Sequence, residues 1–200
     1  MTGTTHYLGG ILAGTALVAC ATPDLTSVGG LGLAAGAVVV SSISSLLPDI
    51  DHHNSRASKR FKILSLLYRL VSNIGKAFKS EVFEHRGIMH TLFIPAILLV
   101  SCFFVKSEAV DYMLFAGIVG YLSHIILDGF NPTGVPLLAP FYNRKIRFLP
   151  KKVCIKTSSG PELLVKFLLM VGIVLVARPI VSMFCAGMSE NLPDIVQNLF

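Results

Sequence analysis

Apolar residues gather in five long stretches along the chain, and polar segments separate them. A helix that crosses a bilayer needs about 20 mostly apolar residues. Stretches that meet this need to different degrees run over residues 7–21, 28–47, 91–105, 112–127 and 163–185, of which the first and third are short. The pattern predicts an all-α fold, a polytopic membrane helix bundle with about five transmembrane helices in a single domain over residues 1–200.

One further, amphipathic helix is expected between the second and third stretches. Over residues 61–78, apolar side chains recur at helical spacing among Lys62, Arg69 and Lys76. Such a helix could lie on the anionic inner leaflet or cap the cytoplasmic end of the bundle, and the pattern leaves both open. The first apolar stretch resembles a signal-peptide core, but no cation precedes it and its glycines have small-xxx-small spacing. Both features favour a retained, packed helix.

Composition agrees with a membrane protein and excludes other classes. The 200 residues are 53% hydrophobic and 14% charged, whereas charged residues make up about 25% of a soluble domain. The four cysteines are far apart with no Cys-x-x-Cys pair, so neither a disulfide framework nor a zinc ribbon is implied. The net charge of +6 is better explained by orientation in a bilayer than by nucleic-acid binding.

The distribution of cations predicts the orientation of the chain. Of the 17 Lys and Arg residues, eight lie in the loop 48–90 and six in the loop 129–162. Because Lys and Arg are retained on the cytoplasmic side, both loops should be cytoplasmic. Five spans with a cytoplasmic N-terminus satisfy every loop. We therefore expect a multi-pass membrane protein with a cytoplasmic N-terminus.

All six histidines fall in short motifs at the ends of the predicted spans. His6 begins the first span, residues 49–53 follow the second, residues 85–90 precede the third, and His124 with Asp128 ends the fourth. The predicted topology brings these four segments to one cytoplasmic edge of the bundle. Since the topology rests on Lys and Arg alone, the gathering of imidazoles and carboxylates is an independent indication of a site.

Each motif also has a purely structural interpretation. His124 and Asp128, four residues apart, share a helix face and could form an ion pair instead of binding a metal. The acidic run at 49–51 could be a capping turn, and Arg86 could be a positive-inside anchor. Glu162 begins the fifth span, where a negative charge favours a helix N-terminus, so its catalytic role is a guess. The convergence of the motifs favours metal.

Nitrogen and oxygen ligands of this kind suit one or two divalent metal ions, with zinc or manganese favoured over magnesium by the histidines. Such a site activates water for attack on an ester or phosphoester, with Arg86 stabilising charge on the transferred group and a spare carboxylate or imidazole accepting the proton. We expect the candidate catalytic residues to be Asp51, Arg86 and Glu162. No nucleophile elbow or P-loop is present in the sequence.

Three motifs, in order and with similar separations, resemble the YdjM-like family of bacterial membrane-bound, predicted metal-dependent hydrolases. They are Leu-Pro-Asp-Ile-Asp-His at 47–52, His-Arg-Gly-Ile-Met-His-Thr at 85–91, and the run at 120–141 that begins Gly-Tyr-Leu-Ser-His-Ile-Ile-Leu-Asp. The resemblance covers nearly the whole chain. It implies an inner-membrane helix bundle, control by the LexA DNA-damage repressor in some members, and a distant relation to zinc-dependent phospholipase C.

The resemblance also implies a set of metal ligands, which by motif match are His6, Asp49, Asp51, His85, His90, His124 and Asp128. Glu162 matches a weaker downstream position. The chain departs from the family pattern at Met89, Asn131 and Thr133. These residues neighbour the expected ligands, so the departures concern substrate preference more than metal binding.

We expect a membrane-bound metal-dependent hydrolase that acts on an ester or phosphoester, with membrane lipids or a lipid-linked substrate as its partners and no nucleic acid. The inner-leaflet depth of the site and the basic loops motivate the lipid. An alternative is a divalent cation or proton transporter that uses the same His/Asp cluster. A third interpretation is a non-catalytic scaffold with a structural metal. The oligomeric state is left open.

Overall fold

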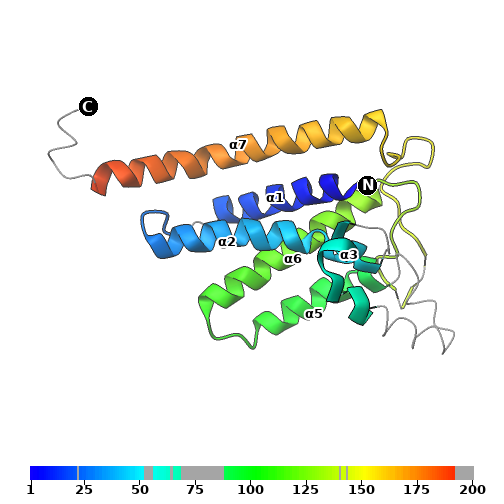
Figure 1. Cartoon of the computed structure of the whole chain (residues 1–200), viewed down its shortest axis with the longest axis horizontal. Coiled ribbons are helices and arrows are strands. Elements are labelled where there is room, and N and C mark those ends of the chain that lie inside the picture. Colours follow the sequence, from blue (N-terminus) through cyan, green and yellow to red (C-terminus); the bar gives the residue numbers. More distant parts are fainter. Residues whose placement is uncertain are drawn as a thin grey trace.

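The structure is a computed structural model, which describes residues 1–21, 23–51, 56–63, 65–68, 88–139, 141–142 and 144–191 (Figure 1). These residues form helices and turns with two isolated β-bridges and no strand. The helices are α1 (Gly3–Cys20), α2 (Val28–Ser44), η1 (Leu47–Asp51), α3 (Arg56–Arg60), η3 (Ile88–His90), α5 (Phe93–Cys102), α6 (Glu108–Gly129) and α7 (Gly160–Asn191). The all-α prediction is confirmed for the described residues.

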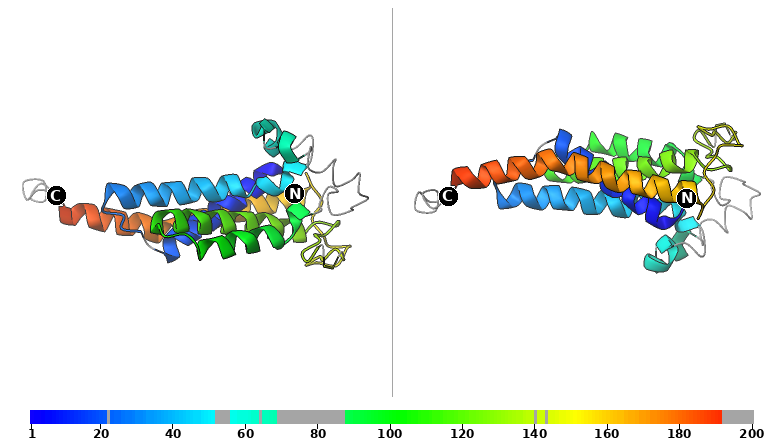
Figure 2. Two further views of the ribbon diagram at one scale, coloured as in Figure 1. Left: turned by 90° about the horizontal axis from the view of Figure 1, so that it is seen from below. Right: turned by 90° about the horizontal axis from the view of Figure 1, so that it is seen from above.

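The five longer helices lie side by side along the long axis of the molecule (Figures 1 and 2). Helix α1 packs against α2, α6 and α7, α2 packs against α6, and α5 packs against α6. Successive long helices run in alternating directions, so one end of the bundle gathers the start of α1, the end of α2, the start of α5, the end of α6 and the start of α7 (Figure 1). Each of the five predicted apolar stretches overlaps one of these helices.

The helix lengths do not confirm five membrane spans. By length and composition, two of the described helices could cross a membrane, over residues 108–129 and 160–186. Helix α5 has 10 residues and rises only about 15 Å, half of the roughly 30 Å hydrocarbon core. In the expected amphipathic segment, residues 62–63 and 65–68 are helical, and most of the remainder lies outside the described residues.

Helices α1, α2 and α6 approach closely because small residues line their contacts. A β-carbon on Gly10 of α1 would lie 2.8 Å from the carbonyl oxygen of Ser41 on α2. The Ser41 hydroxyl donates to the Gly10 carbonyl at 2.8 Å, and the Ser44 hydroxyl donates to the carbonyl of Gly117 on α6 at 2.7 Å. Glycine thus permits the approach and serine bonds the backbones, as in packed membrane helices. This junction fixes α1 and α6 relative to each other.

The segment after α6 folds back over the end of that helix. The backbone amides of Phe148 and Ile155 donate to the carbonyls of Gly129 and Phe130, at 2.9 and 3.0 Å. These carbonyls follow the last helical turns and have no partner within the helix. The loop therefore closes the end of α6 at the same end of the bundle where the histidines gather.

Candidate metal centre

The described histidines and two of the aspartates meet at one end of the bundle. They are His6 from α1, Asp49 from η1, His90 from η3, and His124 and Asp128 from α6. The three imidazoles and Asp128 are buried, whereas the Asp49 side chain keeps 21% of its surface exposed. Four elements thus contribute side chains to one cluster, and Asp49 is the member of the cluster that is partly exposed to solvent.

The ring of His124 lies at the centre of the cluster, and its orientation is fixed by backbone. Its Nδ1 lies 2.7 Å from the carbonyl oxygen of Ser45 at the end of α2. A carbonyl can only accept a hydrogen bond, so Nδ1 carries the hydrogen and Nε2 of the neutral ring presents a lone pair. That Nε2 lies 3.3 Å from Nε2 of His90, 3.7 Å from Asp49 Oδ1 and 3.9 Å from Asp128 Oδ2.

The His6 ring stacks on the His124 ring, with centroids 3.7 Å apart and planes inclined by 17°. Neither ring nitrogen of His6 makes a hydrogen bond to the described residues, although Nε2 lies 3.2 Å from Asp128 Oδ1. Apart from that contact with Asp128, the buried imidazole has no polar partner at Nδ1, which is costly because the ring has lost its hydrogen bonds to water. Metal coordination would supply the missing partner.

The two oxygens of Asp128 have different surroundings. Oδ1 accepts from the Met1 ammonium at 2.8 Å and from the Asn131 side-chain amide at 2.5 Å. Oδ2 faces the imidazoles, 3.8 Å from His90 Nε2 and 3.9 Å from His124 Nε2. Hydrogen bonds to one oxygen therefore orient the other toward the centre of the cluster, as outer partners orient metal ligands.

The donor set fits a divalent cation. Two triads, His6–Asp49–His124 and His90–His124–Asp128, each place one potential ligand atom per residue within 4.8 Å of the others. Two nitrogens bound to one tetrahedral zinc at about 2.0–2.1 Å would lie about 3.3 Å apart, which matches the 3.3 Å between the Nε2 atoms of His90 and His124. Lone pairs and carboxylates facing one point also favour positive charge there. The two triads share His124, so the geometry accommodates one or two ions.

The side chains of three predicted site residues are not among those that the structure describes. The backbone of Asp51 ends η1, but its side chain is not described, and His85 and Arg86 lie outside the described residues. The predicted roles of these three residues remain predictions. Sequence analysis missed the carbonyl of Ser45, which holds His124, and the amide of Asn131, which holds Asp128. The position of Asn131, three residues after Asp128, is the signal that could have identified it.

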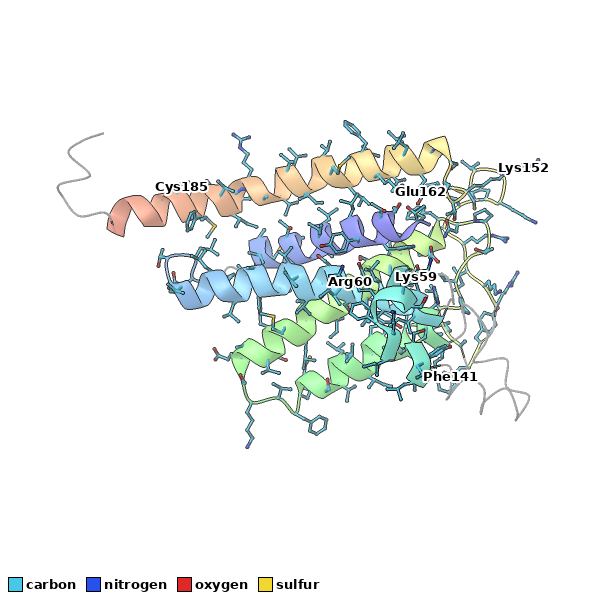
Figure 3. All side chains as sticks on the ribbon, viewed as in Figure 1. Lys59, Arg60, Phe141, Lys152, Glu162 and Cys185 are labelled. Atoms are coloured by element: carbon cyan, nitrogen blue, oxygen red, sulfur yellow. The ribbon has the colours of Figure 1, made fainter. Side chains whose placement is uncertain are left out.

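Glu162 is buried and bound to the start of α1 (Figure 3). Its Oε1 accepts from the Thr2 amide at 2.5 Å and the Thr5 hydroxyl at 2.6 Å, and its Oε2 accepts from the Ser158 amide at 2.5 Å. Thr5 directly precedes His6, so this carboxylate joins α7 to the turn that delivers a candidate ligand. These hydrogen bonds hold the start of α7 against the start of α1, and a catalytic role for Glu162 stays a prediction.

Comparison with known proteins decides the family. The YdjM inner membrane protein family matches residues 1–186 of this chain. The chain belongs to the YdjM family. The family membership expected from its three motifs is therefore confirmed, and the chain is a membrane protein of an inner-membrane family.

Relatives of this chain are found in three bacteria. Uncharacterized protein YvsG of Bacillus subtilis (strain 168) is 36% identical over 142 residues, which cover 70% of this chain and 74% of that protein. Inner membrane protein YdjM of Escherichia coli (strain K12) is 37% identical over 111 residues, 52% of this chain and 49% of that protein. The same values hold for YdjM of Shigella flexneri. No solved structure matches the chain.

Proposed function

We propose that this protein is a membrane-bound metal-dependent hydrolase that cleaves an ester or phosphoester, in a lipid or lipid-linked substrate. The observation that carries the proposal is the meeting of three imidazoles and two carboxylates, from four elements, in two triads that share His124 at one end of the bundle. One or two divalent ions, zinc or manganese, fit these ligands. When bound, such an ion lowers the pKa of a coordinated water and polarises the ester.

Different residues of the chain would bind the ion, orient its ligands and accept a proton. His6, His90, His124 and Asp128 would hold the ion, with Ser45 and Asn131 fixing two of them by hydrogen bonds. Asp49 is the partly exposed member of the cluster. From that position its carboxylate can accept a proton from water that enters with the substrate.

The lipid part of the proposal rests on location. We propose five membrane passes with a cytoplasmic N-terminus, which places the metal centre at the depth of the inner-leaflet head groups. The loop between α6 and α7 lies at the same end and carries six cations: Arg144, Lys145, Arg147, Lys151, Lys152 and Lys156. Cations near an anionic leaflet attract its head groups, so this surface favours anionic lipids.

The distribution of buried charge favours hydrolysis over transport. Among the described residues, the buried ionisable side chains are His6, His90, His124, Asp128 and Glu162. All five are at one end of the bundle, and toward the other end the described part has a partly buried carboxylate, Asp111, but no fully buried ionisable side chain. An ion pathway would require such groups through the membrane.

The test combines metal content with turnover. Wild type, His124→Ala and Asp128→Asn are purified in detergent without chelators, with Asp24→Asn as the matched control because Asp24 is an exposed carboxylate far from the cluster. We expect about one or two equivalents of zinc or manganese, lost in the two site variants and kept in the control. Metal-dependent cleavage of phospholipids, measured by ³¹P NMR, should be lost in the two site variants that lose the metal and kept in the control. Bound metal with no hydrolysis of any phospholipid or phosphoester would refute the enzymatic proposal.

A further inference from the structure

A groove of about 440 Å³ lies between the first turns of α1, the second half of α2, and α3. Its walls are mostly apolar and include Tyr7, Val39 and Ile43, all of which are exposed. Arg60 of α3 lines the same groove, and Figure 3 shows it at the end of the bundle where Glu162 lies. The groove therefore combines an apolar trough with a guanidinium.

A second, shallower hollow adjoins the first. It is lined by Arg60 and Phe61, which also line the groove, and by Lys62, Ile63 and Leu67. Ile63 and Leu67 are 77% and 53% exposed, so this apolar surface is open to a ligand. Two apolar hollows thus flank one arginine, an arrangement that matches a molecule with two hydrocarbon chains and one anionic group.

We propose that the two hollows bind the acyl chains of an anionic diacyl phospholipid and that Arg60 binds its phosphate. This inference rests on the proposed function, because the bound lipid would be the substrate. A guanidinium holds a phosphate with two parallel hydrogen bonds. Lys59 and Lys62, on either side of Arg60 and Phe61, add positive charge and so select a head group of net negative charge.

The groove is lined by residues that neighbour those of the metal centre in the chain. Tyr7 lines the groove and directly follows His6, so neighbouring positions of one helical turn face the two sites. Leu46 also lines the groove, and its carbonyl accepts from the backbone amide of Asp49 at 3.2 Å. Phe61 packs against Leu46 and Ile50, on either side of Asp49. A lipid held here lies beside the segment that carries the open carboxylate of the metal centre.

The test uses the absence of tryptophan from the chain. The variant Tyr7→Trp has a single tryptophan in the groove, and its fluorescence is quenched by phospholipids with brominated acyl chains. Titration in detergent compares brominated phosphatidylglycerol with brominated phosphatidylcholine. We expect half-maximal quenching at about tenfold lower phosphatidylglycerol, because both lipids carry the phosphate but the choline cation of phosphatidylcholine offsets the attraction to the basic residues.

Matched variants decide whether Arg60 is responsible. Adding Arg60→Gln to Tyr7→Trp should raise the half-maximal concentration of both lipids, because each loses the phosphate contact, and should reduce the preference for phosphatidylglycerol. Lys152→Gln, which removes the same charge from the loop after α6, should change neither. The variant Val174→Trp, on the exposed surface of α7, should show no preference. Equal midpoints for the two lipids at Tyr7→Trp, equal effects of Arg60→Gln and Lys152→Gln, or the same preference at Val174→Trp would overturn the proposal.

The binding measurement is independent of turnover. It is repeated with His124→Ala in the Tyr7→Trp background, and we expect lipid selectivity to persist when the metal is lost. Selective binding without hydrolysis in metal-loaded protein would leave the lipid site standing and refute the proposed function. Hydrolysis of phospholipids without selective quenching would leave the proposed function standing and refute the lipid site.

Discussion

The close approach of α1 to α2 makes Gly10→Ala an informative substitution. The new β-carbon would lie 2.7 Å from the β-carbon of Ser45 and 2.8 Å from the carbonyl oxygen of Ser41. Restoring an ordinary separation of about 3.5 Å from 2.7 Å requires α1 and α2 to part by roughly 0.8 Å. The movement would separate His6 on α1 from His124, which the Ser45 carbonyl holds on the α2 side.

The size of the effect follows from three contributions. Overpacking costs about 1–3 kcal/mol, and stretching the hydrogen bond from Ser41 to Gly10 costs about 1 kcal/mol more. Alanine offsets about 1 kcal/mol through its higher helix propensity. The net loss of unfolding free energy is therefore about 1–3 kcal/mol, or a fall in melting midpoint of about 2–4 °C per kcal/mol. A misplacement near 1 Å can also lower turnover about 100-fold.

The assay is a thermal melt in detergent together with metal content and phospholipid hydrolysis, and Gly32→Ala is the control. Gly32 lies in the same bundle on α2, is exposed, and has no atom within 4 Å of the position where a β-carbon would be added. We expect Gly32→Ala to keep metal and to melt at or slightly above the wild-type midpoint. If Gly10→Ala behaves like Gly32→Ala in all three measurements, the reasoning from helix proximity is refuted.

Three further predictions test the surroundings of the metal centre. Glu162→Ala should lower the unfolding free energy by about 2 kcal/mol or more, because it removes the carboxylate that binds the Thr2 and Ser158 amides. Glu162→Gln should restore part of the melting midpoint. If Glu162→Ala instead keeps the wild-type midpoint and loses turnover, the result would indicate a catalytic role. Ser44→Ala should cost about 1 kcal/mol in a thermal melt, whereas Ser182→Ala, which loses a bond within its own helix, should cost less; equal losses would contradict the interhelical role. Chelation should lower the melting midpoint and added zinc should restore it. A ligand present at 100 times its Kd adds about 2.7 kcal/mol to the free energy of unfolding. An unchanged midpoint after chelation would argue that no metal stabilises the fold.

The positions of the helices and the meeting of the histidines could be predicted because each depends on local pattern. Long apolar runs mark the helices, and His6, His90 and His124 lie at their ends, where alternating directions bring them together. The third stretch is short in the sequence too, but the end of α5 at Cys102 could not be predicted, because hydropathy over 91–105 stays high beyond that residue. Apolar composition indicates where a chain can be buried but not where a helix stops.

The partners that orient the site were beyond sequence reasoning for a different reason. His124 is held by the carbonyl of Ser45, a group that every residue has and no pattern marks. Glu162 bonds to Thr2 and Thr5, which lie 160 and 157 residues away in the chain. Contacts of this kind depend on how two helices are placed side by side, which a single sequence does not specify.

The serines of α2 have a consequence for the order in which the protein assembles during synthesis. Ser41 bonds to α1, which the ribosome has already made, whereas Ser44 bonds to Gly117, which is made 73 residues later. Until then the Ser44 hydroxyl can bond back to a carbonyl of its own helix, as Ser42 does with Val38. The α1–α2 hairpin can thus form with its hydroxyls satisfied. Packing of α6 then exchanges a bond within one helix for a bond between two, and the candidate metal centre is completed only at that stage of biogenesis.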